Sequence, residues 1–220
     1  MTDLAGPRAS LRPQSGGDDA PSRSGDGGDA GDRDFARLVF SRVITLASAE
    51  GGGPLTEALG LSGAELRALI ARHLPDRAAL TQALPADAAR GADAIEEPDY
   101  RAYLLECRAG VAEDEETWLA AIIARRSLKP NHLWQDMGFA NRGELSATLG
   151  RYFPELVRRN VGDMKWKKFI YRQLCERDGV LVCKSPNCEI CTDFAVCFGG
   201  EDGEPLATLA HLARPGAPRR

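Results

Sequence analysis

Membrane-spanning and secretory segments are missing from this sequence. No apolar run approaches the ~20 residues that a helix needs to cross a bilayer, and the first residues contain no apolar core of a secretory signal. In the absence of a signal peptide, clustered thiols bind metal more often than they form disulfides. We therefore expect a cytoplasmic protein rather than a membrane protein or a secreted disulfide scaffold.

Catalytic motifs are also scarce. The three histidines, His73, His132 and His211, lie far apart in the sequence, and no glycine-rich phosphate loop or nucleophile motif is present. A hydrolase or a nucleoside triphosphatase is therefore disfavoured. We expect His73 at the edge of the core. His132 should lie at the start of a helix, where capping or packing is the default and a role as an auxiliary metal ligand is the alternative.

An excess of positive charge is absent from the chain as a whole. Its 28 basic and 32 acidic residues give a formal net charge of -4. A DNA-binding protein needs a basic face, because phosphate contacts supply most of its affinity, so nucleic acid is a disfavoured partner. Residues 158–184 are the exception, with eight basic and three acidic residues. This segment predicts attraction of an oxyanion or an acidic partner, and a solvated helix face is the alternative.

The chain divides by composition into four segments. Residues 1–33 contain seven Gly, six Asp, four Ser and three Pro but no Val, Ile or aromatic residue, so they lack the apolar surface that offsets the entropy of ordering. We expect a disordered N-terminal tail there and a helical domain over residues 34–180. A cysteine-rich cluster-binding loop should follow over residues 181–200, and a C-terminal tail over residues 201–220.

Helical patterns dominate the second segment. Apolar residues from Phe35 onward follow helical spacing until Gly51-Gly52-Gly53-Pro54 ends the helix, and Ser62 with Glu65 has the pattern of a capping box. Further helices are expected at residues 100–107, 117–128, 142–149 and 164–177, with Asn141 and Asp163 as N-caps and Gly150 and Gly179 as C-terminal residues. The one credible short strand is at residues 180–182, so the predicted fold class is all-α.

A faint internal repeat relates residues 55–75 to residues 133–154. Each unit reads as a short helix, a tight turn that contains glycine, and a longer capped helix, which resembles helix-turn-helix geometry. Two similar helical lobes that pack on each other are the simpler interpretation. A DNA-binding regulator is the alternative.

Four of the six cysteines form a closely spaced series, Cys183-x4-Cys188-x2-Cys191-x5-Cys197. Zinc ribbons need two close pairs separated by a dozen or more residues, and only one close pair is present. Thiolate ligation from one continuous loop is more typical of an iron–sulfur cluster. Structural zinc, disulfides and free thiols remain open as alternatives.

The remaining cysteines and the neighbouring lysines have simpler interpretations as well as functional ones. Cys107 shares a helical face with Tyr100 and is expected in the core, whereas Cys175 is either a packing residue or an auxiliary ligand. On the helix expected before the cysteine series, one face is apolar (Trp166, Phe169, Ile170, Leu174) and the other carries Lys165, Lys168 and Arg172, with Lys167 at the border. Lys165, Lys167 and Lys168 are the candidate residues for docking an anion or a partner.

Three ordered motifs resemble the NifQ family of nitrogen-fixation proteins. They are His132-Leu133-Trp134-Gln135-Asp136-Met137-Gly138, Met164-Lys165-Trp166-Lys167-Lys168-Phe169 and the cysteine series. The resemblance extends from about Tyr100 to Gly199, and residues 34–90 look like the more variable helical N-terminal part of the family.

The resemblance implies a cytoplasmic protein that handles molybdenum during assembly of the nitrogenase cofactor. It implies a molybdenum-containing iron–sulfur cluster on Cys183, Cys188, Cys191 and Cys197. It also implies transfer of molybdenum to a cofactor under construction on a scaffold complex, with the nitrogenase iron protein as a further partner. Such a protein is a carrier and not an enzyme, and molybdate is its expected anion. A transcription regulator with zinc or a cluster, and a simple electron carrier, are the alternatives.

Overall fold

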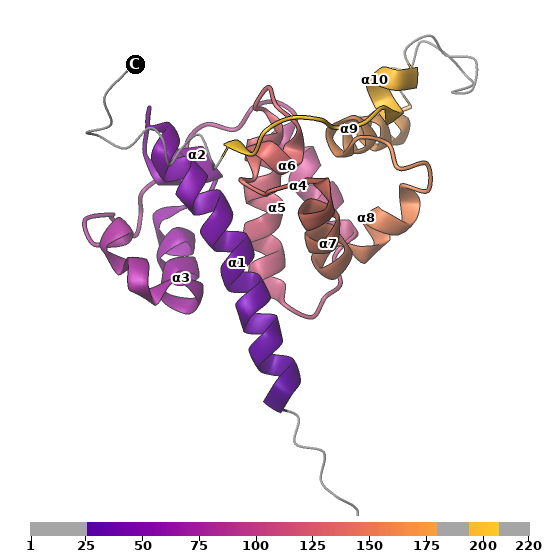
Figure 1. Ribbon diagram of the computed structural model, residues 1–220. Helices are drawn as coiled ribbons and strands as arrows, with labels where there is room; N and C mark the ends of the chain where they lie inside the picture. The colour runs from indigo at the N-terminus through magenta and orange to yellow at the C-terminus, as the bar shows by residue number, and fades with distance from the viewer. Residues whose placement is uncertain (1–25, 180–193, 207–220) are drawn as a thin grey trace, which may run out of the picture.

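The computed structural model describes residues 26–179 and 194–206, and these residues form helices with no strand (Figure 1). The helices are α1 (Asp26–Glu50), α2 (Leu55–Leu59), α3 (Gly63–His73), the 3-10 helix η1 (Pro75–Thr81), α4 (Glu97–Glu106), α5 (Glu113–Ser127), α6 (Leu133–Asp136), α7 (Arg142–Tyr152), α8 (Pro154–Arg159), α9 (Trp166–Arg177) and α10 (Phe194–Phe198). The prediction of an all-helical body is confirmed. The strand expected at residues 180–182 lies outside the described residues.

None of the helices in the described ranges is long and apolar enough to cross a membrane. The core instead forms around α5, against which α2, α3, α4 and α6 pack (Figure 1). α1 contributes to the same core, where the Phe40 ring meets the Trp118 ring of α5 at 6.2 Å between centroids. The residues of α5 from Trp118 to Ala124 are all buried, because helices pack on this element from several sides. Val39 and Val43 of α1 are buried as expected, whereas Leu38 is 48% exposed.

α1 begins earlier than the sequence analysis expected. The helix begins at Asp26 and not at Phe35, so the expected disordered tail over residues 1–33 extends too far along the chain. Asp32 pairs with Arg151 of α7 at 2.9 Å, and the Arg151 guanidinium lies over the Phe35 ring. Glycines in this segment hid the helix, because each costs about 1 kcal/mol of intrinsic helix propensity. Residues 1–25 lie outside the described ranges.

The predicted helix boundaries are correct where a side chain caps the backbone. Ser62 and Glu65 form the expected capping box, with the Glu65 N–H donating to Ser62 Oγ at 3.3 Å. Asn141 Oδ1 accepts from the Glu144 N–H at 3.1 Å, as predicted. Asp163 is not an N-cap, because its φ is 51° and Lys165 precedes the first residue of α9.

Two glycines expected at helix C-termini have different outcomes. Gly179 follows α9 with a φ of 70°, as predicted, whereas Gly150 lies inside α7, which continues to Tyr152. The helices expected at residues 100–107 and 117–128 begin earlier, at Glu97 and Glu113. Acidic residues fill these first turns, where they interact favourably with the helix dipole.

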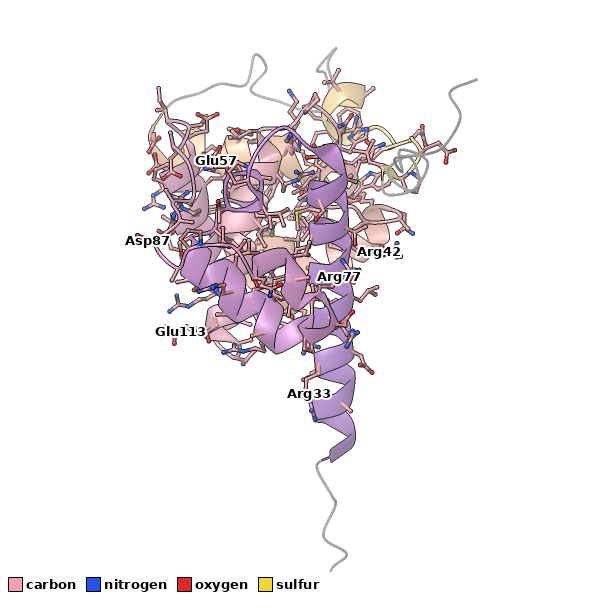
Figure 2. The ribbon with its side chains drawn as sticks, turned by 90° about the vertical axis from the view of Figure 1, so that its left-hand side faces the viewer. Arg33, Arg42, Glu57, Arg77, Asp87 and Glu113 are labelled. Carbon is pink, nitrogen blue, oxygen red and sulfur yellow. The ribbon has the colours of Figure 1, made fainter. Side chains whose placement is uncertain are left out.

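The two repeat units share one core. In each, a short helix ends at a glycine with positive φ, 67° at Gly60 and 75° at Gly138, and a longer capped helix follows. α2 packs on α1 and α5, and α6 packs on α5 and α7. A single hydrophobic cluster contains residues of both units, so the two units share one core, and the predicted division into two lobes is not confirmed. η1 is tied to α1 by Arg77, which donates to Thr45 Oγ1 at 2.7 Å (Figure 2).

Candidate metal centre

The expected metal loop lies between α9 and α10. Cys183, Cys188 and Cys191 lie outside the described residues, and Cys197 is half-buried on α10. No group of three or more metal-binding side chains occurs within the described ranges. The four-cysteine ligand set therefore stays a prediction, and the structure shows how the two ends of the loop are held.

α9, which leads into the loop, is fixed by its apolar face. Trp166, Phe169, Ile170 and Leu174 are buried, as the sequence analysis predicted. α9 packs on α4, where the rings of Tyr171 and Tyr100 meet edge-on at 5.6 Å between centroids. Burial raises the pKa of both tyrosines, to about 12 for Tyr171. The helix that precedes the loop is therefore well packed.

The three candidate docking lysines have different surroundings. Lys167 is largely buried: its Nζ donates to Asp136 Oδ2 of α6 and to the Lys129 carbonyl, both at 2.6 Å. This burial lowers the pKa of Lys167. Lys165 Nζ donates to the Ala195 carbonyl of α10 at 3.4 Å, whereas Lys168 is exposed. Lys167 thus has a structural role, which corrects its prediction as a free docking cation.

α10, which follows the loop, is held against the start of α9. The Lys165 N–H donates to the Cys197 carbonyl at 2.8 Å. Phe198 contacts the turn before α9 so closely that a Cβ on Gly162 would lie 3.2 Å from its ring. The ring also lines a groove of about 280 Å³ with Phe169. The backbone at the fourth cysteine is therefore anchored.

The chain then crosses α6. Figure 1 shows this segment, in yellow, running from α10 back over the top of α6. Glu201, whose side chain is only 4% exposed, places Oε1 3.5 Å from His132 Nδ1 and Oε2 3.0 Å from Arg142 Nη1. Gln135 Nε2 donates to the Glu204 carbonyl at 3.0 Å. Residues 201–206 are thus packed on the body, so the tail expected from residue 201 begins too early.

A buried network of charges lies beneath α6. Arg126 of α5 is fully buried, and its Nε donates to the Asp136 carbonyl at 2.6 Å while its Nη1 donates to Glu50 of α1 at 2.8 Å. Arg126 holds the pKa of Glu50 below its usual value against the opposing effect of burial. Because Asp136 also accepts from Lys167, α1, α5, α6 and α9 are joined by one set of polar contacts.

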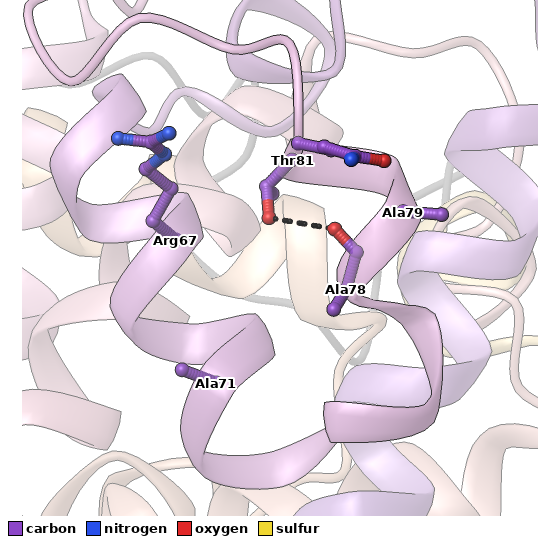
Figure 3. Close-up of a pocket in the computed structure, with 6 residues that line it drawn as sticks. Arg67, Ala71, Ala78, Ala79 and Thr81 are labelled. Atoms are coloured by element: carbon purple, nitrogen blue, oxygen red, sulfur yellow. Dashed lines mark hydrogen bonds between the residues drawn. The ribbon is translucent and has the colours of Figure 1, made fainter.

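Another concavity lies between α3 and η1 (Figure 3). It has a volume of about 610 Å³ and is lined by Arg67, three alanines (Ala71, Ala78 and Ala79), Thr81 and Gln82. The Thr81 hydroxyl donates to the Ala78 carbonyl at 3.2 Å. The lining contains no acid, thiol or imidazole, so it offers no metal ligand or acid–base pair.

Similar known proteins identify the family to which this chain belongs. The family model named NifQ matches residues 39–199 of this chain. The chain belongs to the NifQ family. It is 44% identical over 152 residues to Protein NifQ of Rhodobacter capsulatus, covering 68% of this chain and 81% of that protein. It is 36% identical over 192 residues to Protein NifQ of Azotobacter vinelandii, covering 83% and 98%. No solved structure matches.

A third relative agrees with this assignment. Protein NifQ homolog of Sinorhizobium fredii is 36% identical over 182 residues, which cover 81% of this chain and 78% of that protein. Membership of the NifQ family implies a role in nitrogen fixation. The family match includes all four cysteines of the series, and it also includes α6 and α9, which contact the ends of the loop.

The auxiliary candidates of this NifQ chain lie in different settings. His132 precedes α6, as predicted, and its N–H donates to Gln135 Oε1 at 3.2 Å. Cys175 is half-buried on α9, and its role as an auxiliary ligand stays a prediction. Cys107 is a core residue, as predicted, and burial raises the pKa of its thiol. His73 is buried at the edge of the core beside Glu115.

Sequence reasoning missed the polar residues that contact the segments before and after the loop in this NifQ protein. Asp136 and Gln135 were part of the recognised motif, but nothing in their spacing assigned a contact to them. Arg142 was seen only as the first residue of a helix. Glu201 lies in a run of six acidic or glycine residues, 199–204, and no periodic pattern there signals burial.

Proposed function

We propose that this NifQ protein carries molybdenum in an iron–sulfur cluster bound by Cys183, Cys188, Cys191 and Cys197. It donates this molybdenum for assembly of the nitrogenase iron–molybdenum cofactor. The cluster is cargo, and the protein is a carrier and not a turnover catalyst. Its place of action is the cytoplasm.

The observation that carries this proposal is the complete cysteine series in a chain of this family. Four thiols within fifteen residues supply enough ligands for one centre without help from distant parts of the fold. Thiolates are soft ligands that suit iron–sulfur clusters and the heterometal clusters related to them. The family match includes the whole series.

The described surroundings of the loop suit a carrier. Cys197 is half-buried and its carbonyl accepts a hydrogen bond from the Lys165 N–H, so its backbone is positioned before any metal arrives. Lys165, just before α9, donates its Nζ to the Ala195 carbonyl of α10, and Lys168 is exposed on α9. Positive charge there favours approach of molybdate or of an acidic partner surface. We propose the cofactor scaffold complex and the nitrogenase iron protein as the partners.

A transfer assay tests the donor role. The chain is purified without oxygen from cells supplied with molybdate, and it is then mixed with a molybdenum-free cofactor assembly system as the only molybdenum source. We expect nitrogenase activity to appear with the parent chain and to be absent with variants that carry Cys→Ala at position 183, 188, 191 or 197. The matched control is Cys107→Ala, a buried cysteine outside the series, which should retain donation.

Three other outcomes identify the alternatives. One zinc per chain with no iron would contradict the proposal and indicate a structural metal site. A reversible one-electron couple, with metal retained after mixing with the assembly system, would contradict donation and indicate an electron carrier. Specific DNA binding with a steep salt dependence would support a regulator.

A further inference from the structure

α6 contacts the helix that precedes the cysteine loop and the segment that follows the loop. Asp136 accepts from Lys167, in the first turn of α9, at 2.6 Å. On the side where the loop ends, Gln135 binds the Glu204 carbonyl and His132 lies beside Glu201. One short helix therefore contacts the helix before the loop and the segment after it.

Glu201 is the charged residue of the returning segment. Its side chain is 4% exposed, and it lies between His132 of α6 and Arg142 of α7. Oε2 faces Arg142 Nη1 at 3.0 Å as an ion pair, although the angle is not that of a hydrogen bond. A carboxylate this buried is stable only when it is paired. We call the set of Glu201, His132 and Arg142 the Glu201 latch.

Arg142 links the latch to the turn before α9. Its Nη2 donates to Asp163 Oδ1 at 2.7 Å and to the Met164 carbonyl at 2.9 Å, and its guanidinium lies over the Trp166 ring. Lys165, which follows Met164, donates its N–H to the Cys197 carbonyl. The latch and the backbone contact of Cys197 are thus adjacent parts of one structure.

We propose that Glu201 is a positioning residue for Cys197. The Glu201 latch holds the segment after the fourth cysteine on α6 and α7, and this contact fixes the position of the Cys197 thiol. This inference rests on the proposed role of Cys197 as a ligand. Glu201 itself binds no metal. It lies four residues after Cys197 and beyond the residues that the family model matches, which end at 199.

The test measures thiol reactivity in the full chain stripped of metal. The parent and Glu201→Gln are treated with iodoacetamide, and tandem mass spectrometry follows labelling at Cys197, with Cys107 as an internal reference. Gln keeps the shape of the side chain but removes its charge, and Arg142 keeps Asp163 as a partner. We expect labelling of Cys197 to accelerate about tenfold, because the variant loses the charged contacts that hold the segment after Cys197, while Cys107 is unchanged. Asp202→Asn, an exposed neighbour, should match the parent.

Two results would overturn the inference. Equal labelling rates at Cys197 in the parent and in Glu201→Gln would show that Glu201 does not hold the fourth cysteine. Equal acceleration at Cys197 and at the buried Cys107 would show general unfolding instead of release of one segment.

A second readout uses the protein loaded with iron and sulfide. We expect Glu201→Gln to lose iron to a chelator faster than Asp202→Asn and to show an altered electron paramagnetic resonance spectrum, which a purely structural role distant from the centre would leave unchanged. If the parent binds no iron at all, the proposed function fails, whereas the labelling result for Glu201 stands independently.

Discussion

Lys167 and Lys168 are neighbours in the sequence with different surroundings. Lys167 donates to Asp136 and to the Lys129 carbonyl, and its side chain is 17% exposed. Lys168 is exposed on the outer face of α9. Lys167 is therefore a structural cation, whereas Lys168 is available to an approaching anion.

Lys167→Gln should destabilise the protein by about 3 kcal/mol, because it leaves the buried Asp136 carboxylate without its cation. Lys168→Gln should change the free energy of unfolding by less than about 0.5 kcal/mol. Urea denaturation at neutral pH measures both. If the two variants were equally stable, the buried ion pair would have no structural role.

For donation, we expect Lys168 and its neighbour Lys165 to matter rather than Lys167. In the transfer assay, Lys165→Gln combined with Lys168→Gln should weaken transfer at low salt and lose that effect as salt screens the charges. Unchanged transfer at low and at moderate salt would contradict a role for these lysines in docking.

Glu115 of α5 is a carboxylate whose pairing depends on pH. His73 Nε2 lies 3.2 Å from Glu115 Oε1, and the Tyr152 hydroxyl donates to Oε2 at 3.0 Å. The interaction with His73, followed by that with Tyr152, lowers the pKa of Glu115 from its usual 4.5 in spite of burial. A carboxyl group with a depressed pKa stabilises the folded state above its unfolded pKa and loses that contribution as the pH falls.

Glu115→Gln should therefore flatten the loss of stability in acid. In the parent, the free energy of unfolding should fall as the pH drops below 4.5, and in the variant this fall should be smaller. Glu113→Gln, an exposed residue in the same turn, is the control and should follow the parent. Parallel pH profiles for the parent and Glu115→Gln would contradict this account.

α6 is only four residues long, so its position depends on how the chain leaves it. Gly138 ends the helix with a φ of 75°, and a Cβ there would lie 2.7 Å from the Arg42 carbonyl of α1. Gly110, which precedes α5, has a φ of 76° but no heavy atom within 4 Å of such a Cβ. Alanine would be strained by the positive φ at either position, but only at Gly138 would its Cβ also meet another part of the chain.

Gly110→Ala should cost about 1 kcal/mol from the left-handed conformation alone. Gly138→Ala should cost about 3 kcal/mol, because the new Cβ would also push the end of α6 away from the backbone of α1. Thermal or urea unfolding of the two variants measures the difference. Equal losses would mean that the approach of α6 to α1 is loose.

At the scale of elements, the sequence predicts helices best where capping and periodicity agree. The helix that begins after Ser62 was predicted correctly because its capping box and apolar spacing coincide. The start of α1 was missed because its stabilising contact, Asp32 with Arg151, joins residues more than a hundred positions apart. Local patterns contain no information about such a pair.

At the scale of the whole molecule, the sequence predicts the helical class and the family, but it does not show how the cysteine loop is held. Spacing alone identified the four cysteines as a set. Lys167 looked like a surface cation because helical periodicity places it at a border, and only the fold shows Asp136 opposite it. Glu201 was assigned to a tail for the same reason, since its partners come from α6 and α7.

The whole protein thus consists of a helical body that holds both ends of one cysteine-rich loop. α5 is the central helix of the body, and α6 joins it to the segments before and after the loop. This arrangement supports the proposed carrier role, because the described segments on either side of the cysteine series are held in place by the helical body.

The measurement that tests this account most directly is the metal and sulfide content of the chain. The protein is purified anaerobically from molybdate-supplied cells, together with Cys→Ala variants at positions 183, 188, 191 and 197. The account predicts iron, sulfide and substoichiometric molybdenum in the parent and their loss in each variant. Zinc without iron, or iron and molybdenum retained in all four variants, would contradict it.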